Sequence, residues 1–152
     1  MANTYTVERT TTINAPAESV YEQVVDFRKW EAWSPWADLD PDMRQNYSGA
    51  DSGVGASYAW SGNRKAGQGR MKITEANKPT KVAIALDFVK PFKSSNTTTF
   101  ALTPQGDSTD VAWTMVGPVT LMSRVMGVFM NMDKLIGKDF EKGLDRLKTV
   151  CE

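Results

Sequence analysis

Two charged residues occupy positions where the surrounding pattern is apolar. Arg9 shares strand parity with the apolar residues of an alternating run, and Asp133 falls on the apolar side of a helical pattern. A charge that points inward needs a partner or water, because a lone buried ion is very costly. We expect both residues to be paired or to lie at a rim, with Glu75 or Asp133 as the acid beside Arg9. Contact with the polar end of a ligand is the alternative.

The run WEAWSPW brings Trp30, Trp33 and Trp36 close together along the chain. Each indole carries a large apolar surface with one hydrogen-bond donor, and such rings are usually buried by a core, a partner or a ligand. The run follows a short helical pattern and precedes a series of strand patterns. It therefore predicts a hydrophobic pocket, with Trp33, Trp36 and Phe92 near its entrance.

Most catalytic and metal-binding motifs are absent from the sequence. The chain has no histidine, which excludes histidine-based triads, HExxH zinc sites and imidazole acid–base catalysis. The glycines at 62 and 67 have the spacing of a phosphate-binding loop, but Gln68 stands where its lysine belongs. The segment 38–49 begins like a calcium loop, but Met43 stands at the glycine position and Gly49 at the glutamate position. We expect no metal and no cofactor. An enzyme would need Asp, Glu, Tyr, Lys or Arg as its acid or base, and the sequence nominates no catalytic residue.

Composition indicates an ordinary globular protein. The 152 residues are 41% hydrophobic and 24% charged, and 18 basic residues balance 18 acidic ones, so no global field favours nucleic acid. The first residues do not resemble a signal peptide, and no apolar run is long enough to span a bilayer. We expect one domain over residues 1–152, a cytoplasmic location, no nucleic-acid partner and no integral membrane segment.

The order of local patterns predicts the elements that position these residues. A threonine-rich alternating run at 5–13 indicates a first strand, and apolar spacing from Ala17 indicates a short helix, followed by a helical turn that carries Trp30 and Trp33. Six further strand runs, separated by turn residues, lie between residues 43 and 117 and favour an antiparallel meander. After Pro118 the apolar spacing predicts one helix of about 30 residues.

Strand parity and helical spacing assign an inward face to these elements. One face of the predicted sheet is apolar, and the C-terminal helix is the long amphipathic element that could cover it. Many of the inward side chains are aromatic or methionine, and methionine fits irregular contents. The same stripe is also compatible with a filled core. The predicted lining of the pocket is Tyr58, Trp60, Met71, Phe88, Trp113, Met115, Met126, Phe129 and Met130.

Taken together, the segments INAP, ESVYEQVVDF, WEAWSPW, PDMRQNYSG, GVGASYAWSG, GQGRMKITEA, DFVKPF and MGVFMNMDKLIGKDFEKGLDRL resemble the START-like (SRPBCC) superfamily. Within it, they are similar to the polyketide cyclase/dehydrase-related branch over nearly the full chain. The resemblance implies an α+β helix-grip fold, with a curved seven-stranded antiparallel sheet around a long C-terminal helix and two short helices after the first strand. It also implies a deep hydrophobic cavity, and it supplies no catalytic residue set.

The resemblance implies that the chain binds or carries a small hydrophobic molecule such as a lipid, sterol, quinone or polyketide. Arg9 and Asp133 would then orient a polar end of that ligand. A polyketide cyclase or dehydratase is the alternative, and a protein-interaction domain is the second alternative. We expect a binding protein rather than an enzyme, present as a monomer or homodimer.

Overall fold

The computed structural model describes residues 4–36, 40, 42–63, 67–90, 93–118 and 132–152, with side chains in the last range from residue 136 onward. Phe92, Met126, Phe129 and Met130 lie outside the described residues, and so does the side chain of Asp133. The expectations placed on them therefore stay predictions.

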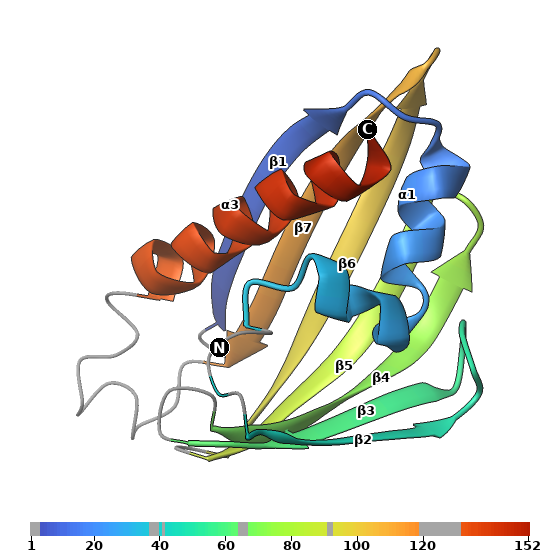
Figure 1. Cartoon of the computed structure of the whole chain (residues 1–152). Helices are drawn as coiled ribbons and strands as arrows, with labels where there is room; N and C mark the ends of the chain where they lie inside the picture. The colour runs from blue at the N-terminus through green and yellow to red at the C-terminus, as the bar shows by residue number, and fades with distance from the viewer. Residues whose placement is uncertain (1–3, 37–39, 41, 64–66, 91–92, 119–131) are drawn as a thin grey trace.

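In the described part of the chain, seven strands form one antiparallel sheet in the order β1-β7-β6-β5-β4-β3-β2 (Figure 1). The strands are β1 (Thr4–Ile13), β2 (Arg44–Gly49), β3 (Ala56–Ser61), β4 (Gln68–Asn77), β5 (Lys81–Lys90), β6 (Ser94–Gln105) and β7 (Ser108–Pro118). Each strand from β2 to β6 pairs with the next strand along the chain, and β1 pairs with β7. The predicted meander is confirmed.

The sheet is curved, and its concave face is the apolar one predicted by parity. On β7 the alternate residues Val111, Trp113 and Met115 are buried, and on β5 Val82 and Ile84 are buried. Successive side chains of a strand point to opposite faces, so the other parity carries the polar residues to solvent. The core therefore lies against one face of the sheet.

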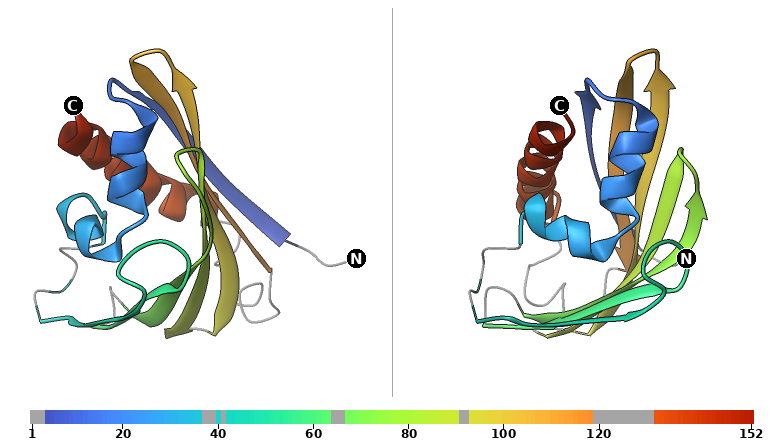
Figure 2. Two further views of the ribbon diagram at one scale, coloured as in Figure 1. Left: turned by 90° about the vertical axis from the view of Figure 1, so that its right-hand side faces the viewer. Right: turned by 45° about the vertical axis from the view of Figure 1, so that its right-hand side comes forward.

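Two short helical elements follow β1 and cover part of this face (Figure 2). Helix α1 (Ala17–Val24) begins after Pro16 and buries Val20 and Val24. The 3-10 helix η1 (Phe27–Ala32) begins where the Asp26 side chain accepts a hydrogen bond from the backbone N–H of Arg28. The predicted helical turn is confirmed, although Trp33 lies just after it, because the chain turns toward Pro35 and Pro35 has no N–H to continue the helix.

Helix α3 (Met132–Cys151) lies on the same side of the sheet and packs mainly against β1. Phe140, Leu144 and Leu147 are buried on its inner side. This part of the predicted C-terminal helix is confirmed, and the part before residue 132 lies outside the described residues. Val150 continues the apolar spacing but is exposed.

A glycine sets how closely α3 approaches the core. A Cβ atom at Gly143 would lie 2.8 Å from the Trp113 ring and 2.9 Å from the Pro35 ring. These separations are below van der Waals contact, so the missing side chain lets the helix pack directly on both rings. The close approach joins the helix to the segment that carries the tryptophans.

Candidate ligand-binding cavity

The described residues enclose a cavity of about 440 Å³ between the concave face of β2–β5, η1 and helix α3. Small-molecule sites occupy about 300 to 1,000 Å³, so this volume lies in their range. The lining residues are Phe27, Trp30, Glu31, Ser34, Trp36, Met43, Gln45, Tyr47, Tyr58, Trp60, Gly67, Met71, Leu86, Phe88, Lys90, Met115, Ile136 and Asp139.

One side of the cavity is a continuous wall of aromatic rings. Tyr47 lies 5.1 Å from Tyr58 between ring centroids, Tyr58 stacks on Trp60 at 6.0 Å, and Trp60 meets Phe88 edge to face at 6.0 Å. Phe27 on η1 lies 6.1 Å from Tyr58. Rings packed at such distances stabilise one another, so the wall is preformed without a ligand.

The inner end of the cavity is aliphatic and methionine-rich. Met71 on β4, Leu86 on β5 and Met115 on β7 line it, and all three are buried. Methionine is flexible and polarizable, which suits it to contents of irregular shape. The shape of the cavity at this end can therefore adapt to the ligand.

The opposite side is built by helix α3 and the turn that carries Trp36. The indole Nε1 of Trp36 donates a hydrogen bond to Asp139 Oδ2 at 3.0 Å, and both residues line the cavity. A guanidinium nitrogen of Arg146, Nη1, donates to the carbonyl oxygen of Ser34 at 3.0 Å. These two bonds tie the turn to α3 and hold Trp36 on the cavity lining.

The cavity also has a polar group beside the aromatic wall. The hydroxyls of Tyr47 and Tyr58 both donate to Gln45 Oε1, at 3.3 and 3.2 Å. Burial, with smaller contributions from Tyr47 and Glu31, raises the pKa of Tyr58 to about 12. Burial and then Glu31 also raise the pKa of Tyr47. Both phenols therefore stay protonated at neutral pH.

Six of the predicted contact residues line the cavity together, namely Trp36, Tyr58, Trp60, Met71, Phe88 and Met115. Parity predicted the inward direction of the five that lie on strands, and the curvature of the sheet brings them to one space. Whether they contact a ligand stays a prediction.

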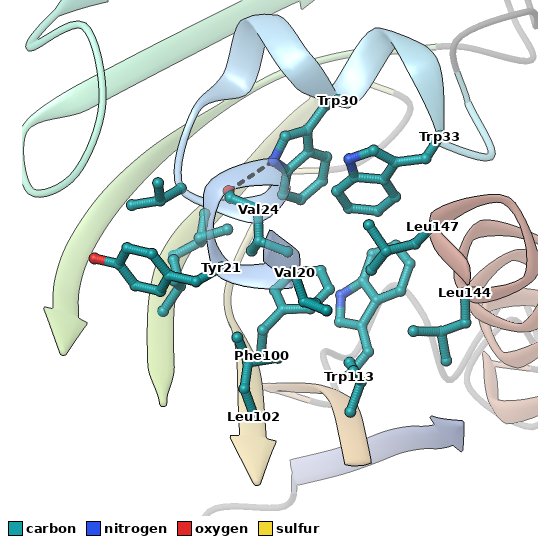
Figure 3. Close-up of a cluster of buried hydrophobic side chains, with 14 of the residues drawn as sticks. Val20, Tyr21, Val24, Trp30, Trp33, Phe100, Leu102, Trp113, Leu144 and Leu147 are labelled. Carbon is teal, nitrogen blue, oxygen red and sulfur yellow. Dashed lines mark hydrogen bonds between the residues drawn. The ribbon is translucent and has the colours of Figure 1, made fainter. Parts of the chain in front are cut away.

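Trp33 and Trp113 do not line the cavity, and their predicted places need correction. Figure 3 shows both indoles within the core beside Phe100 and Leu147, and both are fully buried. Trp33 lies 5.7 Å from Trp113 between ring centroids and donates from Nε1 to the carbonyl oxygen of Gln23. The entrance position predicted for Trp33 is wrong, because its ring turns into the layer between α1 and α3.

Arg9 points inward as parity predicts, and Glu75, one of its two predicted partners, does not pair with it. The other predicted partner, the Asp133 side chain, lies outside the described residues. Its Nε lies 3.1 Å from Glu141 Oε2, and its Nη1 donates to the carbonyl oxygen of Glu8. Glu75 pairs instead with Lys81. A Cβ atom at Gly137 would lie 2.1 Å from Arg9 Nη2, so the absent side chain leaves room for the guanidinium under α3. Arg9 does not line the cavity, so the structure places it in a pair between β1 and α3.

The replacement Glu141→Gln should lower the free energy of unfolding by less than about 1 kcal/mol. The Glu141 side chain is 60% exposed, so water screens the charge, and Arg9 keeps its bond to Glu8. Urea denaturation of the two proteins measures this difference. A loss of several kcal/mol would instead mean that the pair is desolvated and that the rim position is incorrect.

Several cavity residues were not predicted, among them Glu31, Gln45, Tyr47 and Asp139. Gln45 and Tyr47 share a parity on β2, which could have indicated the inward direction, but the strand has too few apolar residues to show it. Glu31 and Asp139 carried no signal, since acids on helices usually face solvent. The described side chains contain no cluster of acidic, cysteine or histidine residues suited to a metal ion.

The curved sheet around a C-terminal helix, with a cavity between them, is the helix-grip arrangement of START-like proteins. The chain belongs to the family described as "Polyketide cyclase / dehydrase and lipid transport", whose model matches residues 4–152. The resemblance drawn from the sequence is confirmed. No curated protein matches the chain. Among the described residues, no helix has the length and apolar character needed to cross a membrane.

Solved structures support the fold. A protein from Chromobacterium violaceum superposes with a TM-score of 0.69 at 15% identity, covering 97% of this chain and 96% of that one. Truncated norcoclaurine synthase from Thalictrum flavum gives 0.68 at 13% identity, covering 98% and 94%. The Aha1 dimer from Colwellia psychrerythraea gives 0.64 at 16% identity, covering 97% and 96%. These likenesses establish a shared architecture.

Proposed function

We propose that the protein binds or carries a small hydrophobic molecule in the cavity between the sheet and α3. The observation that carries the proposal is a cavity of about 440 Å³ whose walls are mainly aromatic rings and methionines. When an apolar molecule enters the cavity, its surface and the surface of the wall are removed from water. This burial contributes roughly 25 cal/mol of binding free energy per Å² of apolar surface, before the costs of association. The family description, which includes lipid transport, supports the same class of ligand.

The proposed contacts fall into two groups. Those on the described lining are Trp36, Tyr58, Trp60, Met71, Phe88 and Met115, and the structure adds Phe27, Tyr47 and Leu86 beside them. Phe92, Met126, Phe129, Met130 and Asp133 remain predicted contacts from the sequence. The proposal keeps the expectation of a cytoplasmic protein that is a monomer or a homodimer.

A second candidate, a cyclase or dehydratase, is favoured by two carboxylates on the lining. Glu31 from η1 and Asp139 from α3 both border the cavity, and a carboxylate can act as a general base or, when protonated, as a general acid. Asp139 already accepts a hydrogen bond from Trp36, which would orient it. The interaction-domain alternative predicts a filled interior, and the cavity does not favour it.

Ligand binding is tested on protein isolated from its own cells and on purified protein. Native mass spectrometry should show a retained apolar molecule. Titration with a fatty acid, a sterol, a quinone or a flat aromatic compound should give a saturable change in indole fluorescence, because Trp36 and Trp60 line the cavity. The bound protein should also have a higher melting temperature, because a ligand that binds only the folded state stabilises that state. A broad apolar panel that gives neither signal, with no retained molecule, would contradict the proposal.

A further inference from the structure

Two tyrosine hydroxyls on the cavity wall converge on one oxygen atom. Tyr47 and Tyr58 donate to Gln45 Oε1 at 3.3 and 3.2 Å, and all three residues line the cavity. Tyr47 and Tyr58 are direct cross-strand partners of β2 and β3, and Gln45 is the partner of Trp60, so the three side chains share the concave face. Two donors aimed at a single acceptor form a site for an oxygen atom.

Contacts with neighbouring side chains hold both phenols in place. Tyr58 is stacked on Trp60 at 6.0 Å, and the Arg28 guanidinium lies 5.0 Å from the centroid of the Tyr47 ring. These neighbours restrict the rings before any ligand arrives. The two hydroxyl donors are thus largely oriented before binding, so a ligand loses little affinity to the entropy cost of ordering them.

The present acceptor is replaceable. Both bonds to Gln45 are longer than the 2.7 to 2.8 Å usual for hydroxyl donors. Gln45 is exposed, so its amide can turn to water. A ligand that covers the phenols and excludes water must offer them an oxygen, since a buried unpaired donor is costly.

The charge beside this pair selects among oxygen acceptors. Glu31 lines the cavity, and its negative charge contributes, after burial, to the raised pKa of both tyrosines. The Arg28 guanidinium beside Tyr47 lowers the pKa of Tyr47, but it contributes less than Glu31 does, and Asp26 raises that pKa further. A ligand carboxylate here would meet the same repulsion. Lys90, the ammonium on the described lining, is on β5, which β4 and β3 separate from β2 in the sheet. The site therefore suits a neutral acceptor.

We propose that Tyr47 and Tyr58 form a two-donor subsite that binds an uncharged carbonyl oxygen of an apolar ligand and disfavours a carboxylate. The inference deepens the proposed function and rests on it. Ketones, quinones and esters meet the requirement, and an ionised fatty acid does not. Tyr47, Tyr58 and Glu31 are then the residues that determine specificity.

Three naphthalenes of matched shape test the subsite by equilibrium dialysis. The probes are 2-acetylnaphthalene, which carries a carbonyl, 2-ethylnaphthalene, which does not, and 2-naphthoate, which is an anion at neutral pH. The wild type should bind the acetyl compound more tightly than the ethyl compound, by roughly 2- to 12-fold for each phenol that donates. It should bind 2-naphthoate more weakly than 2-acetylnaphthalene.

Isosteric variants assign the preference to these residues. Tyr47→Phe and Tyr58→Phe should each lower affinity for 2-acetylnaphthalene by about two- to tenfold and leave 2-ethylnaphthalene unchanged. Together they should abolish the preference. Glu31→Gln should raise the affinity for 2-naphthoate by up to about fivefold. Tyr21→Phe is the matched control, because Tyr21 is buried on α1 away from the cavity lining, and it should change neither affinity.

The outcomes separate this inference from the proposed function. Equal binding of the acetyl and ethyl compounds by the wild type, or a preference that survives in the double variant, overturns the subsite and leaves the proposed function standing. Binding of 2-naphthoate at least as tight as that of 2-acetylnaphthalene overturns the charge selection. Failure of all three compounds to bind overturns the subsite, and the proposed function fails as well if the broad apolar panel also gives no signal and no molecule is retained.

Discussion

Replacing Phe140 with alanine is expected to lower the free energy of unfolding by about 3 to 5 kcal/mol. Phe140 is 1% exposed and stacks on Trp113 with ring centroids 4.0 Å apart and planes 9° from parallel. It also meets the Trp36 ring at 6.3 Å. The variant would leave a void between α3 and the sheet that neighbouring rings are too rigid to fill.

Urea denaturation measures the difference in the free energy of unfolding between the two proteins. The midpoint temperature of thermal unfolding should fall by about 2 to 4 °C for each kcal/mol lost. Val150→Ala on the same helix is the matched control. Val150 is 40% exposed, so its loss should be within about 0.5 kcal/mol. A loss below about 1 kcal/mol for Phe140→Ala would show that α3 does not anchor the core.

Replacing Met71 with tryptophan should strongly weaken ligand binding while the fold is retained. Met71 is buried on β4 and lines the cavity, so the larger indole of a tryptophan at this position can occupy the empty space. Overpacking a filled core lowers the free energy of unfolding by about 1 to 3 kcal/mol, and filling a void should lower it by less. The lost volume should lower the affinity for 2-acetylnaphthalene by more than about tenfold, equivalent to 1.4 kcal/mol.

Equilibrium dialysis measures the binding, and circular dichroism with urea denaturation checks the fold. Met71→Leu conserves volume at the same position and should bind as the wild type does. If Met71→Trp binds with unchanged affinity, the ligand does not occupy this cavity. If Met71→Trp unfolds and Met71→Leu does not, the interior is already filled at this position.

The order of β2 to β7 and the inward faces could be read from the sequence, since both depend on local rules. The place of β1 beside β7 joins distant parts of the chain and follows from no local rule. Turn residues between the strand runs allow only short connections, and side chains alternate along each strand. Five of the predicted lining residues, including Trp60 and Met71, were predicted from this alternation. Tyr47 was missed because β2 is an edge strand with an exposed, polar sequence, so its parity carries no apolar signal.

The two tryptophans that follow η1 show what local patterns leave open. Trp33 and Trp36 are close in sequence, yet Trp33 is fully buried in the core and Trp36 lines the cavity and donates to Asp139. Their different positions depend on where the turn meets α3. That contact joins residues 103 positions apart.

The sequence by itself determined the antiparallel sheet, its apolar face and the amphipathic helix opposite it, because periodicity and turn chemistry act over a few residues. Only the tertiary structure decided that Arg9 pairs with Glu141, that Glu75 pairs with Lys81, and that two tyrosines share one acceptor. The physical reason is that parity fixes the direction of a side chain but not the residue that meets it. That partner depends on how the helix docks on the sheet and on how strongly the sheet curves.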